Sequence, residues 1–189
     1  MKANRSRTRW TYAEFARLPS ETGTRYEIID GELVVTPSPS VRHQRIVTDL
    51  VTLLNTFVRS NDLGQLFSGP LDVLFAEGDY LEPDVVFVGH GKAKLVSERG
   101  IEGPPDLVVE VASPSTAKRD RGIKLDRYRH FGVREYWMVD GYARTLEVWD
   151  LARGAETARV LGETDRLAWT PVDGGPTLEV DVGAILGSA

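Results

Sequence analysis

The run Leu107-Val108-Val109-Glu110-Val111-Ala112 is an apolar strand pattern interrupted by a single carboxylate. Because side chains alternate between the two faces of a strand, Glu110 shares a face with Val108 and Ala112, and the other three residues occupy the opposite face. A second run, Pro83-Asp84-Val85-Val86-Phe87-Val88, begins with another carboxylate. We interpret both runs as strands, and their continuous apolar character predicts a sheet covered on both faces.

The segments around these strands predict an α/β fold. Asp30-Gly31 lies between the strand patterns 26–29 and 32–35, which is typical of a tight β-hairpin. Apolar residues recur at helical spacing over 41–59, and a second helix is predicted from about 116 to 131, ending at Gly132. Further strands are predicted at 71–76, 135–140 and 145–150, and smaller ones at 158–160, 167–169 and 178–180, with a short helix capped by Thr11 and Glu14 near the start. The order ββαβββαββ predicts a mixed sheet flanked by helices.

Length and composition bound the class of protein. The 189 residues fit one domain, predicted at 10–189 after a flexible basic arm at 1–9. The absence of cysteine excludes a disulfide scaffold, a thiolate nucleophile and a zinc–sulfur site. Neither a membrane-length apolar run nor a signal-peptide pattern is present, so we expect a soluble, cytoplasmic protein. A formal net charge of −5 argues against a protein that coats nucleic acid through its overall charge.

The two strand carboxylates and the helix that follows them are the candidate functional residues. Charged side chains are seldom buried unless they are paired or bound to a metal ion, so Asp84 and Glu110 favour a site for Mg²⁺ or Mn²⁺. The alternatives are an edge strand or an arginine pair for Glu110, and a simple strand start for Asp84. The segment 117–129 holds six basic and two acidic residues, and Lys124 shares one helix side with Asp120 and Tyr128. A solvated basic helix is the alternative there.

Several ordered motifs resemble those of the Uma-two family, a group classed as endonucleases with the restriction-endonuclease-like PD-(D/E)XK fold. The similarity runs from about residue 10 to 150 and continues more weakly beyond. The motifs that carry it are Arg25-Tyr26-Glu27-Ile28-Ile29-Asp30-Gly31-Glu32-Leu33, Ser38-Pro39-Ser40-x-Arg42-His43-Gln44, Glu82-Pro83-Asp84-Val85-Val86-Phe87-Val88, Gly103-x-Pro105-Asp106-Leu107-Val108-Val109-Glu110-Val111-x-Ser113-Pro114-Ser115-Thr116 and Gly132-Val133-x-Glu135-Tyr136-Trp137-x-Val139-Asp140, together with Asp120, Lys124 and Tyr128.

The resemblance implies roles for particular residues. Asp84 and Glu110 match the two acids that would bind a divalent metal ion. The usual signature has a lysine two residues after the second acid, and here that position is Ala112. The family is thought to have moved this lysine to the following helix, where it corresponds to Lys124. Glu27 matches a further acid of the site, and a half-exposed hairpin position is its alternative.

Three other residues are candidates for contacts with nucleic acid. Arg119 and Arg121 could hold DNA phosphates, as could the N-terminal arginines. His43 could contact a phosphate, although a solvated histidine is the alternative. The aromatic residues Tyr128, Tyr136 and Trp137 are expected in the core.

The leading hypothesis is a Mg²⁺-dependent endonuclease that hydrolyses DNA phosphodiester bonds and acts as a homodimer. The departure at Ala112 motivates a second hypothesis, a nuclease-like module that binds nucleic acid or a partner without cutting. A third is a metal-dependent hydrolase of some other phosphoester.

Overall fold

The two carboxylate-bearing runs form neighbouring strands in the centre of a mixed sheet. The computed structural model describes residues 9–19 and 24–186. In it, β6 (Val85–Gly89) pairs antiparallel with β9 (Leu107–Ala112), which pairs parallel with β10 (Glu135–Asp140). The sheet order is β12-β11-β10-β9-β6-β3, in which β11 spans Thr145–Asp150, β12 Arg159–Gly162 and β3 Gly64–Ser68.

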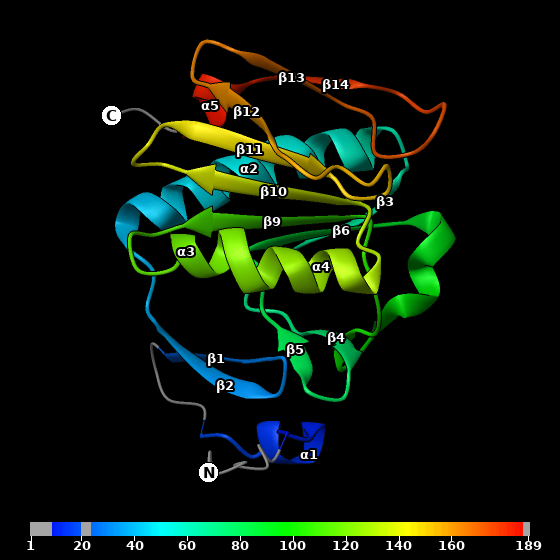
Figure 1. Cartoon of the computed structure of the whole chain (residues 1–189). Coiled ribbons are helices and arrows are strands. Elements are labelled where there is room, and N and C mark those ends of the chain that lie inside the picture. Colours follow the sequence, from blue (N-terminus) through cyan, green and yellow to red (C-terminus); the bar gives the residue numbers. More distant parts are fainter. Residues whose placement is uncertain (1–8, 20–23, 187–189) are drawn as a thin grey trace.

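Helices cover both faces of this main sheet, as the sequence predicts (Figure 1). The long helix α2 (Val41–Ser60) lies on one face, and α5 (Val182–Leu186) packs beside it. The other face is covered by one helical segment made of α3 (Ala117–Arg119), the π-helical turn η2 (Asp120–Lys124) and α4 (Leu125–Phe131). Gly132 ends that segment in the left-handed conformation, with φ 82°.

The alternation predicted for β9 is confirmed. Leu107, Val109 and Val111 belong to the apolar cluster beneath α2. Val108 and Ala112 belong to the cluster beneath α4. The side chain of Glu110 therefore leaves the strand on the α4 face, where it is expensive to bury without a partner.

A second six-stranded sheet lies below the first and has the order β2-β1-β5-β4-β8-β7 (Figure 1). The predicted hairpin forms its edge, and Asp30 and Gly31 have φ 51° and 82°, as a two-residue turn requires. One sheet was expected, but the strands of the described residues divide among two six-stranded sheets and a third sheet of two strands. The bounds of this sheet are β1 (Thr24–Ile29), β2 (Glu32–Pro37), β4 (Val73–Ala76), β5 (Asp79–Leu81), β7 (Val96–Ser97) and β8 (Gly100–Ile101).

The chain crosses between the two sheets at Glu82-Pro83-Asp84, immediately after β5 and immediately before β6. Proline has no backbone N–H and cannot continue a hydrogen-bonded ladder, so a strand pattern breaks at Pro83. A second crossing joins β3 to β4 through Gly69-Pro70, and the Gly69 N–H donates to the Asp84 carbonyl at 2.8 Å. These crossings place Asp84 between the sheets.

The remaining elements are two short helical segments and a separate two-stranded sheet. Near the start, α1 (Tyr12–Phe15) has the predicted capping box of Thr11 and Glu14. The 3-10 helix η1 (His90–Leu95) follows β6, and β13 (Arg166–Trp169) pairs with β14 (Leu178–Asp181). Residues 1–8 of the predicted basic arm lie outside the described residues. Over the described ranges, no helix combines the length and apolarity of a membrane span.

Candidate active site

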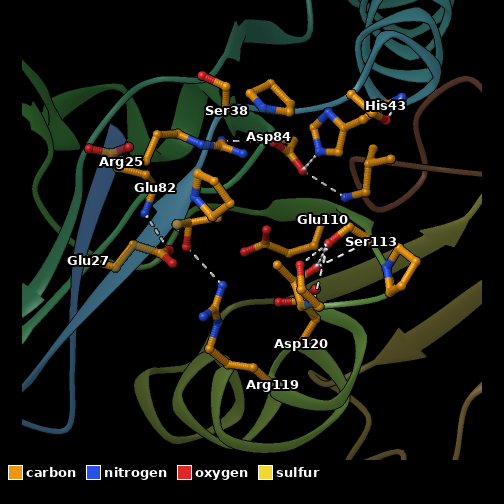
Figure 2. A pocket seen from close by; sticks show the side chains of 18 of the residues that line it. Arg25, Glu27, Ser38, His43, Glu82, Asp84, Glu110, Ser113, Arg119 and Asp120 are labelled. Carbon is orange, nitrogen blue, oxygen red and sulfur yellow. Dashed lines mark hydrogen bonds and ion pairs between the residues drawn. The ribbon is translucent and has the colours of Figure 1, made fainter. Parts of the chain in front are cut away.

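The strand register brings Asp84 and Glu110 together. The antiparallel ladder of β6 and β9 ends at the pair Val85–Val109, and beyond it the Asp84 backbone N–H donates to the Val109 carbonyl at 3.2 Å. Asp84 therefore lies beside the part of β9 that carries Glu110, and both side chains line one cavity. The two carboxylates are 4% and 5% exposed, respectively. They therefore form a buried acidic pair, which Figure 2 shows at the centre of a pocket.

Asp84 is held by three donors. The Arg25 Nη1 donates to its Oδ1 at 3.0 Å, and its Oδ2 lies 3.1 Å from the His43 Nε2 and 2.8 Å from the Val111 backbone nitrogen. Burial acts to raise the pKa of Asp84, but these hydrogen bonds and charges outweigh it, so the pKa is lowered. Asp84 is accordingly an ionised carboxylate in a fixed orientation.

Glu110 accepts from two side chains of the helical segment on its own face. Lys124 Nζ lies 2.8 Å from Glu110 Oε1, and the Tyr128 hydroxyl donates to the same oxygen at 2.6 Å. Lys124 also contacts Glu27 Oε1 at 2.7 Å. Burial lowers the pKa of Lys124, but the charges of Glu110, Glu27 and Asp120 outweigh it and raise that pKa, so the ammonium stays charged. Lys124 thus lies beside Glu110, where the resemblance leads us to expect the lysine that Ala112 does not supply.

Two alternatives considered from the sequence are wrong for these residues. Lys124 is 3% exposed rather than solvated, and Glu27 is 3% exposed rather than half-exposed on its hairpin. The Glu82 backbone N–H donates to Glu27 Oε1 at 3.0 Å, so the crossing segment and the hairpin are joined at this carboxylate. The structure therefore brings together the four residues predicted as the catalytic set: Asp84, Glu110, Lys124 and Glu27.

These residues line a cavity of about 200 Å³. Its described walls carry five carboxylates, against three permanent cations and one histidine; the carboxylates are Glu27, Glu82, Asp84, Glu110 and Asp120, and the cations Arg25, Arg119 and Lys124. Glu82 Oε2 is buried without a hydrogen-bond partner among the described residues, and burial raises the pKa of Glu82 to about 7. Burial also raises the pKa values of Glu110 and Asp120. The cavity therefore holds more carboxyl groups than permanent cations, and burial opposes the ionisation of three of these carboxyls.

A divalent cation fits this charge pattern. Mg²⁺ is commonly bound by only one or two carboxylates, with water completing its coordination. Oxygen donors from Asp84 and Glu110 suit that ion and Mn²⁺. Among the described residues, no group of three or more His, Cys, Asp or Glu side chains is arranged to hold a metal ion. The protein ligands of any metal ion would thus be Asp84 and Glu110, with no larger set of ligands already arranged around the site among the described residues.

The three residues predicted to contact nucleic acid occupy different places. Arg119 lines the cavity, where its Nη2 donates to the Thr36 Oγ1 at 3.0 Å and its buried Nε lacks a partner among the described residues. Arg121 points elsewhere and binds Glu147 at 2.6 Å and Asp140 at 3.2 Å. His43 is 7% exposed, so the alternative of a solvated histidine is wrong.

Sequence reasoning missed several residues of this cavity. Arg25 lies two residues before Glu27 on β1, so the period of two that places both on one face was a usable signal. Tyr142 in the β10–β11 turn and the hydroxyl-bearing segment 113–116 also line the cavity. Tyr142 had no signal of its own, because an aromatic residue in a turn does not reveal which cavity it faces.

With this geometry in view, comparison with known proteins gives the family. The Uma2 family model, described as "Putative restriction endonuclease", matches residues 12–182. The chain belongs to the Uma2 family. The fold of this Uma2 chain is similar to that of a solved structure titled a "putative nuclease belonging to DUF820" from Anabaena variabilis ATCC 29413, with a TM-score of 0.77, 20% sequence identity, and coverage of 94% of this chain and 97% of that one.

A second protein to which this chain is similar is also distant from it in sequence. The Uma2 chain is 25% identical over 139 residues to the "Uncharacterized protein sll1609" of Synechocystis sp. (strain ATCC 27184 / PCC 6803 / Kazusa). That match covers 72% of this chain and 78% of the relative. The family resemblance expected from the motifs is confirmed, as is a restriction-endonuclease-like α/β fold.

Proposed function

We propose that this chain is a metal-dependent endonuclease that hydrolyses phosphodiester bonds of DNA in the cavity between its two sheets. The observation that supports this most directly is the acidic pair Asp84–Glu110 with the Lys124 ammonium beside it. Membership of a family described as restriction endonucleases points the same way. The cavity supplies the two kinds of group that phosphoryl transfer needs, carboxylates for a cation and fixed positive charge.

The metal ligands in this proposal are Asp84 and Glu110. A divalent ion such as Mg²⁺ or Mn²⁺ bound there would supply positive charge at the phosphate and lower the pKa of water. Arg25, His43 and the Val111 N–H hold the Asp84 carboxylate in one orientation, and the Tyr128 hydroxyl does the same for Glu110. These contacts are fixed before substrate binds, so the ligands need not reorganise.

Two cations act on the substrate directly. Lys124 is fixed by Glu27 and Glu110, so its charge lies where negative charge develops on the phosphoryl oxygens. Arg119 has a buried Nε without a partner among the described residues, and an incoming phosphate oxygen would satisfy it. Glu27 acts through Lys124, as a positioning residue.

The test is cleavage of circular DNA, both single-stranded and supercoiled, with Mg²⁺ or Mn²⁺. We expect wild-type protein to convert both substrates and chelation by EDTA to stop the reaction. Asp84→Asn and Glu110→Gln should each lower the rate at least a hundred-fold, because each removes a charged ligand. Asp126→Asn, an exposed carboxylate on α4, is the matched control and should cleave like wild type.

Folding of the variants is checked by their thermal melts, so that loss of activity is not confused with loss of structure. Undiminished cleavage by folded Asp84→Asn and Glu110→Gln would remove the proposed mechanism. A wild-type protein that cuts no DNA with either metal would remove the function itself.

A second candidate is a nuclease-like module that binds DNA without cutting. The specific observation in its favour is that Arg25 and His43 already engage both oxygens of Asp84, as a permanent ion pair would. Metal titration separates the two. If wild type binds DNA equally tightly with EDTA and with Mn²⁺, never turns over, and is unaffected by Lys124→Ala, the binding module is the better description.

A further inference from the structure

One aromatic side chain stands at the rim of the cavity with most of its surface in solvent. Tyr142 is 57% exposed and lines the same cavity as Asp84 and Glu110. Burying an aromatic ring is normally favourable, and Tyr128 and Tyr136 are both fully buried in the core nearby. An exposed ring beside a candidate active site is therefore a feature that folding alone does not require.

The backbone that carries Tyr142 is fixed. Asp140 Oδ1 accepts from the backbone N–H groups of Tyr142 and Ala143 at 3.0 and 2.9 Å. Gly141 packs directly on α2, where an added Cβ would lie 2.5 Å from the Ile46 Cδ1. The turn thus presents the ring from a rigid support, with little entropy left to lose when a ligand binds.

A guanidinium group accompanies the ring. The Arg42 Cζ lies 5.0 Å from the centroid of Tyr142, and Arg42 Nη1 donates to the Gly141 carbonyl at 3.1 Å. An aromatic ring next to a held cation is the combination by which proteins bind single-stranded nucleic acid, since the ring stacks on a base and the cation attracts the backbone.

The depth of the cavity restricts the form of the DNA. The side chains of Asp84, Glu110, Glu27 and Lys124 are only 3–5% exposed, at the base of about 200 Å³ of space. A phosphate in a duplex is held beside its neighbours on a stiff rod, whereas a phosphate in an unpaired strand can enter a recess and release its base to one side. The recess and the rim aromatic point to the same kind of substrate.

We propose that the cavity takes an unpaired DNA strand, and that the base next to the bound phosphate stacks on Tyr142. This inference rests on the proposed nuclease function and names the substrate form for that site. Stacking of every base is similar, so the platform selects for unpaired DNA and not for sequence.

The experiment measures binding and cleavage separately. Binding is followed in EDTA by the fluorescence of 2-aminopurine placed within a twelve-nucleotide single strand, and the same strand annealed to its complement is the duplex probe. Tyr142→Phe keeps the stacking face, Tyr142→Leu keeps bulk without it, and Val160→Ala, an exposed apolar residue on β12, is the control outside the cavity.

We expect wild type, Tyr142→Phe and Val160→Ala to quench the probe and to bind the single strand at least ten-fold more tightly than the duplex. Tyr142→Leu should bind the single strand about ten-fold more weakly and lose the quenching, with an unchanged melting temperature. Equal binding of duplex and single strand, or a Tyr142→Leu protein that binds like wild type, would overturn the inference. A protein that stacks the base but cleaves nothing would instead overturn the nuclease function.

Discussion

Lys124 is the residue on which the buried charges depend. Its ammonium nitrogen lies 2.7 Å from Glu27 Oε1 and 2.8 Å from Glu110 Oε1, and all three side chains are almost fully buried. Lys124→Met would leave two buried carboxylates without their cation. We expect the free energy of unfolding at pH 8 to fall by about 3–5 kcal/mol, the usual cost of breaking a buried ion pair.

The pH dependence of this fall in the free energy of unfolding of Lys124→Met shows whether it is caused by charge or by packing. Burial raises the pKa of Glu110, and without the Lys124 charge that pKa rises further, so the folded protein can take up a proton there and the penalty shrinks as the pH falls toward 5. Urea unfolding at pH 5 and 8 measures this. Lys118→Met, an exposed lysine on α3, should change stability by no more than about 0.5 kcal/mol. An equal loss at both pH values would mean that packing, not charge, dominates.

Asp72, which lines a neighbouring pocket together with Glu82 and Asp84, provides a second test of buried charge. Burial raises the pKa of Asp72 above its usual value. A carboxyl whose folded pKa is raised favours the folded state below its unfolded pKa, near 3.8, and that contribution is lost as the pH rises through the folded pKa. Asp72→Asn should therefore raise the melting temperature at pH 7.5 and not at pH 3.5. Glu98→Gln, an exposed carboxylate, should shift neither melt, and a destabilised Asp72→Asn protein at pH 7.5 would contradict the prediction.

The site was predictable from the sequence to the extent that its residues break a pattern. Glu110 interrupts an apolar strand, and the family motifs marked Asp84, Lys124 and Glu27. Glu82 and Asp120 also stand in these motifs but were not assigned to the site, because their burial follows from how the two sheets and the helical segment meet. The hydrogen-bond partners of these carboxylates could not be predicted either, because residues such as Arg25 and Asp84 are 59 residues apart in the chain.

At the scale of elements, Gly132 decides where the helix that carries Lys124 ends. It has φ 82°, and an added Cβ would meet no atom within 4 Å. Gly132→Ala therefore isolates backbone strain and should cost about 1 kcal/mol in urea unfolding. Gly91→Ala in η1 also meets no atom, and its φ lies outside the left-handed region, so its change should stay within about 0.5 kcal/mol. Equal losses of stability in the two variants would mean that the left-handed backbone at Gly132 is not the cause.

The long, strongly patterned elements were predicted well, and the shortest strands of the second sheet were not. β9 has the predicted bounds Leu107–Ala112, and Gly132 caps the helix as expected. β5, β7 and β8 have only two or three residues each, too few to show alternation. The π-helical turn η2 was also missed. There Gly122 departs from helical geometry, and the Tyr136 hydroxyl donates to the Asp120 carbonyl at 3.2 Å, a tertiary contact without a local sequence pattern.

For the whole molecule, the two-sheet arrangement explains why a carboxylate-rich cavity is stable. Strands of both sheets and the helical segment each contribute one member of the Glu27–Lys124–Glu110 cluster, so the charges are paired only when the layers have assembled. Folding and assembly of the cavity are therefore one event. The homodimer expected from the sequence stays a prediction that sedimentation can test.

The acidic net charge predicts how strongly the binding of DNA depends on salt concentration. With a formal net charge of −5, the protein gains little from long-range attraction to phosphates. Binding should therefore depend on a few cations, such as Arg119 in the cavity wall and Arg42 next to the rim residue Tyr142. Two or three phosphate contacts on a single strand predict a slope of about −1.5 to −2 in a plot of log binding constant against log salt concentration.

Arg119→Gln should make the slope shallower by about 0.7, whereas Arg153→Gln, an exposed arginine outside the cavity, should leave it unchanged. Titrations with a single-stranded oligonucleotide between 50 and 400 mM KCl measure the slope, and a value steeper than about −4 would require a binding surface far larger than this cavity.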